Sequence, residues 1–527
     1  MRTVPACCRS APSLAIASDD MIGRALPNLP AAQEIIVPLP EGVSLANPHK
    51  LFIGGRWVAP KAGGTIEVVS PDTEKVVAVV AEATEPDVDA AVAAARKAFD
   101  TGPWPGMEPA ERAAVVRKMA GLLARRQDEL ARAFVAEIGA LASFAPFAAM
   151  GGTGTFDSYA NIAEKYSWVK EEASTVPGHK ALVIREPVGV VAAIVPWNMP
   201  YAIMAQKVAP ALVAGCCVIM KPSPETPLEA YIIAEAAEQA GLPPGVLSLL
   251  PAHREAADYL VRSAGVDKIS FTGSTAAGRR IATVTGERIA RVTLELGGKS
   301  AAIVLDDMPT AVAARILART IIVLSGQVCA MLSRAIVPAA RHDELAEAIA
   351  TEMRAVKIGP SGDPSTEMGP IAMKRQLERI ERYVEIGVRE GAKLVTGGRR
   401  PPHLKTGYFY EPTLFAGVDN KMTIAQEEIF GPVLALLPAR DIDHAIEIAN
   451  ESTYGLNSAV LTNNVDEVYR IGRRLRAGNV GHNGMKADFN LPFGGFKQSG
   501  VGREGGIEGL MPYIETKTML IERPVAA

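Results

Sequence analysis

From about residue 181 onward, short apolar segments rich in β-branched residues alternate with segments whose apolar residues recur at helical spacing. This alternation predicts a parallel, doubly wound sheet with helices on both faces. A second alternating series over residues 311–480 predicts a second α/β domain after the first. The strands of the first series are expected at residues 190–195, 216–220, 246–249, 268–271 and 301–305, and its helices at 203–213, 227–240, 254–264 and 275–285.

Length and composition agree with this class. A chain of 527 residues is too long for a single core, so two or three domains are expected. A hydrophobic content of 48% with 21% charged residues is ordinary for a soluble globular protein. The formal net charge of −3 argues against nucleic acid or an anionic membrane as the main partner. No apolar run approaches the roughly 18 residues that a membrane helix needs.

The N-terminal part is less regular. Residues 1–50 are rich in proline and alanine and are predicted to form an extension. Arg2 and Arg9, with no acidic residue before Asp19, leave three interpretations open: a transit peptide, a loosely ordered extension, or a start at Met21. Residues 51–58 predict a hairpin with a Gly-Gly turn, and residues 86–99, 109–138 and 153–172 predict helices.

Cysteine usage points to a reducing compartment, and we expect the cytoplasm. Cys7-Cys8 and Cys216-Cys217 are adjacent pairs, a poor spacing for disulfides, and only Cys329 stands alone. The seven histidines are scattered, and no Cys-x-x-Cys or His-x-x-x-His spacing occurs. The sequence therefore predicts no metal site.

Three strings suggest chemistry. Cys329 follows a Gly-Gln turn, Glu295 ends a predicted strand ahead of Gly297-Gly298, and residues 271–274 read as a strand running into a phosphate-binding helix. A lone cysteine is often a small buried hydrophobe. A glycine pair can serve close backbone approach or an unusual torsion equally well. Together, however, a thiol, a carboxylate base and a dinucleotide site suggest oxidation through a covalent intermediate.

These strings, together with residues 196–200, 427–432 and 492–500, resemble the NAD(P)-dependent aldehyde dehydrogenase superfamily from about Leu51 to the C-terminus. The resemblance implies a Rossmann-type cofactor-binding domain (residues 51–168 and 188–296) and a catalytic domain (297–500). It also implies a β arm with a tail (169–187 and 501–527), in which residues 512–521 pair with a hairpin to bridge the subunits of a dimer or tetramer.

The resemblance also implies roles for particular residues. Cys329 would be the nucleophile, Glu295 the base that activates water, and Asn198 an oxyanion donor together with the Cys329 N–H. Because Glu295 is present, the expected product is the free acid and not a coenzyme A thioester. The implied cofactor contacts are Gly273 and Ser274 at the pyrophosphate, Lys221 at the adenosine ribose, Glu428 at the nicotinamide ribose, and Trp197 and Phe430 nearer the nicotinamide.

Cofactor choice is less defined by the sequence. Relatives that favour NAD often carry a glutamate three residues after the lysine, but here that position is Pro224, and Glu225 follows it. A 2′-phosphate would meet less repulsion without that carboxylate. We therefore expect NAD with weak discrimination, and NADP as the alternative.

The acceptor pocket is expected to be apolar. Its candidate residues predict a medium-sized hydrophobic aldehyde, aliphatic or aromatic. Arg334 leaves open a carboxylated semialdehyde as the alternative substrate. A catalytically silent binding or structural member is disfavoured, because all the catalytic groups are present. The candidate pocket residues are Met199, Val323, Leu324, Met331 and Phe489.

Overall fold

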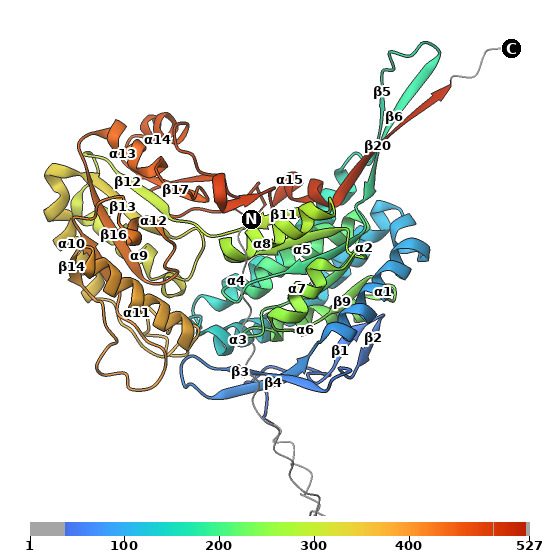
Figure 1. Ribbon diagram of the computed structural model, residues 1–527, viewed down its shortest axis with the longest axis horizontal. Helices are drawn as coiled ribbons and strands as arrows, with labels where there is room; N and C mark the ends of the chain where they lie inside the picture. The colour runs from blue at the N-terminus through green and yellow to red at the C-terminus, as the bar shows by residue number, and fades with distance from the viewer. Residues whose placement is uncertain (1–36, 489, 523–527) are drawn as a thin grey trace, which may run out of the picture. The chain divides into compact units, whose positions relative to one another are not determined.

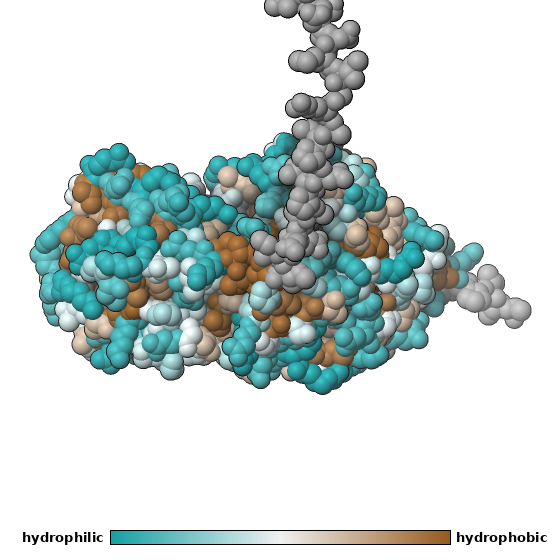
Figure 2. Space-filling view, turned by 90° about the horizontal axis from the view of Figure 1, so that it is seen from below, coloured by the Kyte–Doolittle hydropathy of each residue, from teal (hydrophilic) through white to brown (hydrophobic). Residues whose placement is uncertain are grey.

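The computed structural model describes residues 37–488 and 490–522. Cys7, Cys8, Met21 and Phe489, on which some of the sequence predictions depend, lie outside these ranges. Two large sheets flanked by helices carry the fold (Figure 1). The predicted α/β class is confirmed. In the view of Figure 2 the surface is mostly hydrophilic, with apolar residues gathered in separate patches.

The first sheet has the strand order β19-β11-β10-β7-β8-β9-β1-β2. Its five central strands run parallel, and β7 lies between β8 and β10. Among the five parallel strands the chain starts at β7, adds β8 and β9 on one side and then β10 and β11 on the other, which creates a topological switch point beside β7. The strands are β1 (Leu51–Ile53), β2 (Arg56–Val58), β7 (Val190–Ile194), β8 (Cys217–Lys221), β9 (Leu247–Leu249), β10 (Lys268–Thr272), β11 (Arg291–Glu295) and β19 (Gly500–Val501).

The helices that belong to this sheet largely follow the predicted spacing, and the hairpin β1–β2 is confirmed. Val43 and Leu45, within the predicted N-terminal extension, are buried in the same core. The helices are α1 (Glu85–Thr101), α2 (Pro109–Ala124), α3 (Gln127–Ile138), α4 (Ala145–Lys165), α5 (Pro200–Ala214), α6 (Leu228–Ala240), α7 (Arg254–Arg262) and α8 (Thr275–Glu287).

Two helix predictions were wrong in their bounds. Residues 109–138 form two helices and not one, because residues 125–126 interrupt the helix between α2 and α3. The helix expected over residues 153–172 ends at Lys165, and Val169–Glu172 is strand β5. The backbone of β5 pairs with β6, and all four of its side chains are exposed, so their spacing carried no information about burial.

The second sheet has the order β14-β15-β16-β13-β12-β17-β18, parallel except for β14. The chain passes from β11 in the first sheet to β12 in the second through residues 296–299 only. Its strands are β12 (Ser300–Val304), β13 (Leu332–Pro338), β14 (Lys393–Thr396), β15 (Thr413–Ala416), β16 (Val433–Ala439), β17 (Asn457–Leu461) and β18 (Asn479–His482). Its helices are α9 (Thr310–Ile321), α10 (His342–Arg354), α11 (Lys374–Arg389), α12 (Thr423–Gln426), α13 (Ile442–Asn450) and α14 (Val465–Gly472).

Two smaller sheets complete the described structure. Strand β20 (Ile514–Glu522) pairs along its whole length with β6 (His179–Pro187), which also pairs with β5. This confirms the predicted pairing of the C-terminal strand with the hairpin, and the three strands extend beyond the helices (Figure 1). A separate hairpin joins β3 (Gly64–Val69) to β4 (Val76–Glu82), and the short helix α15 (Gly506–Leu510) precedes β20.

Candidate active site

A pocket of about 220 Å³ opens at the switch point of the first sheet. The residues after β7 and after β10 form one side of it, as expected for ligand sites in open α/β sheets. The segment that precedes β13 and the segment that follows α12 form the other side. The pocket brings together seven of the predicted site residues: Trp197, Asn198, Gly273, Ser274, Cys329, Glu428 and Phe430.

Cys329 lies three residues after a strained turn. The 3-10 segment Val323–Gly326 contains Leu324 and Ser325 with positive φ, and Gly326 has φ +76° with the backbone of Gly431 close to where a Cβ would be. Burial raises the pKa of the Cys329 thiol to about 12, and the nearby carboxylates of Glu428 and Glu295 add to the shift. The thiol of the free protein is therefore protonated at neutral pH.

Asn198 is tied to the segment that carries the nucleophile. Its Nδ2 donates a hydrogen bond to the backbone carbonyl of Gln327 at 3.0 Å. Gln327 is itself anchored, because its side chain donates to the Leu324 carbonyl and accepts from the Ala372 N–H. An amide held in this way is preorganised to stabilise an oxygen anion formed beside Cys329.

Glu295 ends β11 and is only 3% exposed. Within residues 37–488 and 490–522, neither of its carboxyl oxygens has a hydrogen-bond partner. Burial raises its pKa well above the usual range, and the carboxylate of Glu504 raises it further, while Lys207 and Arg503 oppose the shift. The raised pKa makes this carboxylate a stronger proton acceptor than an exposed glutamate, which suits a general base.

An ion pair that the sequence prediction missed lies near Glu295. Lys207 on α5 contacts Glu504, and the lysine Nζ also lies 3.4 Å from the Ser270 hydroxyl. Both charged side chains are buried. The available signal was that Lys207 is the single charged residue of α5, because a charge in an otherwise apolar buried helix needs a partner.

The Gly297-Gly298 pair permits close approach to two functional groups. A Cβ on Gly297 would lie 2.2 Å from Glu428 Oε2, and one on Gly298 would lie 2.5 Å from the Cys329 carbonyl oxygen. Neither glycine has positive φ, so close approach and not an unusual torsion accounts for the pair. The Gly298 N–H donates to Glu428 Oε1 at 3.1 Å, and burial raises the Glu428 pKa to about 7.

Two polar residues of α11, which the sequence prediction also missed, hold the segment around Glu428. Gln376 Nε2 donates to the carbonyls of Ile429 and Phe430, at 3.0 and 2.7 Å. Arg379 donates to the Glu428 carbonyl at 2.6 Å. These contacts support the Phe430 ring, which meets the ring of Trp197 edge-on with centroids 5.3 Å apart.

The nucleotide side of the pocket offers donors without partners. Ser274 caps α8 by accepting from the Ala277 N–H at 3.3 Å, and the first turn of this helix carries no acid. The buried Thr272 hydroxyl has no hydrogen-bond partner in the described residues. At the end of β8, burial lowers the pKa of Lys221 to about 8, and no described residue forms a hydrogen bond or ion pair with its ammonium group. Free donors beside a helix N-terminus fit a pyrophosphate-linked dinucleotide.

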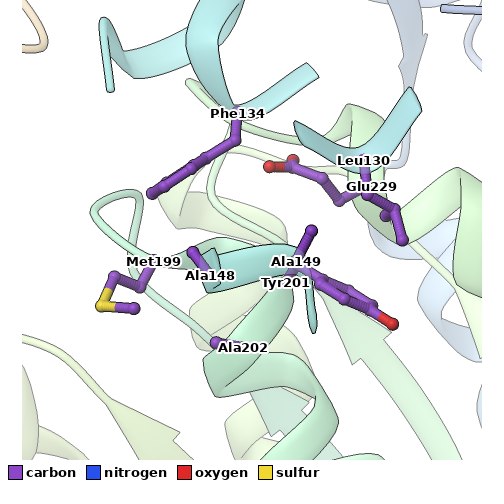
Figure 3. Close-up of a pocket in the computed structure, with 8 residues that line it drawn as sticks. All are labelled: Leu130, Phe134, Ala148, Ala149, Met199, Tyr201, Ala202 and Glu229. Carbon is purple, nitrogen blue, oxygen red and sulfur yellow. The ribbon is translucent and has the colours of Figure 1, made fainter. Parts of the chain in front are cut away.

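None of the four described acceptor candidates lines the Cys329 pocket. Met199 lines a separate small cavity between α3, α4, α5 and α6, together with Phe134, Tyr201 and Glu229 (Figure 3). Val323 and Met331 pack in a hydrophobic core of the second sheet, whereas Leu324 packs against the hydrophobic core of the first sheet. Nothing is described at Phe489.

Arg334, the residue behind the semialdehyde alternative, is fully engaged elsewhere. Its guanidinium donates to the carbonyls of Lys299, Ile448 and Ala449 and to the side chain of Asn420. It is 2% exposed. The structure therefore assigns Arg334 to the second sheet's interior and does not place it in the pocket.

Neither a metal centre nor a membrane-spanning helix is found in the described part of the chain. Among residues 37–488 and 490–522, no group of three or more His, Cys, Asp or Glu side chains is arranged to hold a metal ion. None of the helices described in these ranges is long and apolar enough to cross a membrane.

A half-buried thiol, an unpartnered carboxyl group of raised pKa and a nucleotide-type pocket are typical of a dinucleotide-dependent enzyme with a cysteine nucleophile. Comparison with known proteins agrees: the chain belongs to the aldehyde dehydrogenase family, whose model matches residues 57–519. The predicted family and fold are thereby confirmed.

Individual relatives are similar over nearly their whole length. The chain is 43% identical to the geranial dehydrogenase of Castellaniella defragrans over 89% of this chain and 98% of that protein. It is 40% identical to the 3-succinoylsemialdehyde-pyridine dehydrogenase of a Pseudomonas species, over 90% of this chain and 98% of that one. A crystal structure of a Mycobacterium tuberculosis aldehyde dehydrogenase complexed with NAD+ superposes with a TM-score of 0.88 at 43% identity, covering 92% of this chain and 100% of the other.

Proposed function

We propose that this protein oxidises an aldehyde to the carboxylic acid with a nicotinamide dinucleotide. The observation that carries the proposal is the meeting of Cys329, Asn198 and Glu428 in one pocket at the switch point, with the unpartnered carboxyl of Glu295 close enough to raise the pKa of the thiol. The activity is that of the family to which the chain belongs.

The chain's own groups have distinct roles in this reaction. Cys329 loses its proton and its sulfur adds to the aldehyde carbon, while the carbonyl oxygen becomes an anion held by Asn198 Nδ2 and the Cys329 N–H. The bound dinucleotide supplies a hydride acceptor. The acyl group then remains on Cys329 as a thioester, and Glu295 takes a proton from the water that hydrolyses it. The products are the acid, the reduced cofactor and one proton.

The dinucleotide is proposed to lie along the carboxyl ends of β8, β7 and β10. Gly273, Ser274 and the first turn of α8 would hold the pyrophosphate, and Lys221 the adenosine ribose. Glu428 would bind the nicotinamide ribose, with Phe430 and Trp197 beside the ring. NAD is the proposed cofactor, with NADP as the alternative, and the similar Mycobacterium tuberculosis enzyme is complexed with NAD+.

For the substrate, we propose a medium-sized hydrophobic aldehyde. The similarity to a geranial dehydrogenase supports it. A carboxylated semialdehyde is the second candidate, favoured by the similarity to the pyridine semialdehyde enzyme. Arg334 gives this candidate no support, since its donors are already used. Kinetics with hexanal, benzaldehyde and succinate semialdehyde separate the two, and a clear preference for the last would reject the first.

We further propose self-association through the β arm and a cytoplasmic location. Val169, Met519 and Leu520 are exposed apolar residues on the three-stranded sheet, and a partner subunit would cover them. The functional division into cofactor-binding residues 51–168 and 188–296, catalytic residues 297–500 and arm residues 169–187 and 501–527 belongs to the same proposal. Light scattering of the full chain, compared with a Leu520→Glu variant, tests the association.

Two variants test the chemistry directly. Cys329→Ser is expected to keep dinucleotide binding and to lose nearly all turnover. Glu295→Gln is expected to give one rapid burst of reduced cofactor and then stall, because the thioester persists. A wild-type kcat in the first variant, or a coenzyme A thioester as product, would contradict the proposed mechanism.

A further inference from the structure

An ion pair beyond the end of β8 joins a segment of the first sheet to helix α11. Arg375 lies 2.6 Å from Glu225 Oε1, and the Ser223 hydroxyl donates to Glu225 Oε2. Glu225 belongs to the segment after β8 in the first sheet, whereas Arg375 belongs to the first turn of α11, which packs with the second sheet's elements. In the same turn, Gln376 lines the Cys329 pocket. The first turn of α11 therefore contributes both to the Cys329 pocket and to the ion pair beyond β8.

The charges around this ion pair are unequal. Lys221 and Arg375 are cationic, and Glu225 is the acid that interacts electrostatically with both. Although burial opposes its ionisation, the hydrogen bond and the charge of Arg375, together with the Ser223 hydroxyl, lower the pKa of Glu225 overall. The carboxylate is thus ionised at neutral pH, and one positive charge remains uncompensated among these three residues.

An acid that selects NAD accepts hydrogen bonds from the adenosine ribose hydroxyls and repels a 2′-phosphate. Pro224 has no carboxylate to offer, and both oxygens of Glu225 are occupied by protein donors. The Arg375 side chain is 63% exposed and retains further N–H donors. A guanidinium in this position suits a phosphate, which it can bind with two parallel hydrogen bonds.

We propose that Arg375 is a cofactor-selecting residue: it holds Glu225 away from the adenosine ribose and offers its guanidinium to a 2′-phosphate, so that the protein accepts NADP as well as NAD. This inference rests on the proposed function and on Lys221 marking the adenosine ribose.

Nucleotide-binding measurements test this proposal without any catalytic turnover. NADH and NADPH are titrated calorimetrically into the full-length protein, freed of nucleotide and without aldehyde. The wild-type dissociation constants for NADH and NADPH are expected to agree within about tenfold. Arg375→Ala is expected to raise the dissociation constant of NADPH by about tenfold or more and to change that of NADH by less than about threefold. Glu225→Gln removes a negative charge and is expected to lower the dissociation constant of NADPH relative to that of NADH. Arg382→Ala, an exposed arginine on the same helix, is the matched control and leaves both constants unchanged.

Several results would overturn the inference. If Arg375→Ala weakens the binding of both nucleotides equally, the Arg375–Glu225 pair only joins two segments of the fold. If the ratio of the two dissociation constants is unchanged, Arg375 has no role in cofactor selection. A wild-type preference for NADH above about a hundredfold would exclude NADP use altogether. In these cases the proposed function stands, because NADH still binds. A protein that binds neither nucleotide and shows no Cys329-dependent reduction would instead reject the proposed function itself.

Discussion

The side-chain amide of Asn198 donates a hydrogen bond to the backbone carbonyl of Gln327 at 3.0 Å. This contact joins the end of β7 in the first sheet to the segment that carries Cys329. One N–H of the amide is used to hold the segment, and the other remains to stabilise the oxygen anion of the adduct. Asn198 therefore has both an anchoring and an electrostatic role.

The two roles of Asn198 can be separated by mutation. Asn198→Ala is expected to lower kcat by about 10²–10³-fold, the usual loss for one oxyanion donor, with little change in dinucleotide affinity. Asn457→Ala is the matched control, because Asn457 Nδ2 donates to the Ala330 carbonyl at 3.0 Å on the other side of Cys329 and does not line the pocket. Equal losses of kcat in both variants would show that anchoring alone matters.

The raised pKa of Cys329 predicts that its thiol reacts slowly with alkylating reagents in the free protein. Because the pKa lies near 12, the thiolate fraction rises about tenfold with each pH unit. The rate of iodoacetamide alkylation at Cys329, followed by peptide mass spectrometry, should therefore climb from pH 7 to 10 without a plateau. Cys329→Ser supplies the background from the other cysteines. A plateau below pH 8 would show that the free site already stabilises the thiolate.

The buried pair near Glu295 predicts opposite shifts of the pH profile. Glu504→Gln removes a charge that raises the Glu295 pKa, so this pKa falls and the acid limb of kcat moves to lower pH. Lys207→Met removes a charge that lowers it, so the limb moves to higher pH. The measurement is kcat against pH with the same aldehyde.

Both variants of this pair must be checked for folding by circular dichroism, because breaking a buried pair typically costs about 3–5 kcal/mol. Glu504→Gln keeps the shape of the side chain and an acceptor for Lys207, so it is the safer of the two. Shifts in the same direction for both folded variants would show that the pair acts through structure and not through charge.

Arg334 is predicted to stabilise the protein and to leave substrate choice alone. Arg334→Met removes donors from three backbone carbonyls and from Asn420, and unsatisfied buried acceptors cost about 1–3 kcal/mol each. We expect a lower thermal midpoint, measured by calorimetry, with unchanged relative rates for succinate semialdehyde and hexanal. Arg473→Met, at an exposed position, is the control. A selective loss of activity toward the semialdehyde would contradict this prediction.

Much of the fold and several site residues were accessible from the sequence. The alternating periods predicted the central strands of the first sheet, because burial on both faces of a parallel sheet leaves a local apolar pattern. The pairing of residues 512–521 with the hairpin was expected and is confirmed. The end of α4 was missed, since the exposed side chains of β5 carry no such pattern.

By itself, the sequence determined the α/β class, the family and the strings that contain Cys329, Glu295 and Asn198, because each of these is written in contiguous residues. The tertiary structure alone decided which charged side chains meet. It pairs Lys207 with Glu504, 297 positions away, pairs Arg375 with Glu225, and buries Arg334 in the interior of the second sheet. The physical reason is electrostatic. The charge state and the free donors of a side chain depend on its burial and on neighbours that only folding brings within reach.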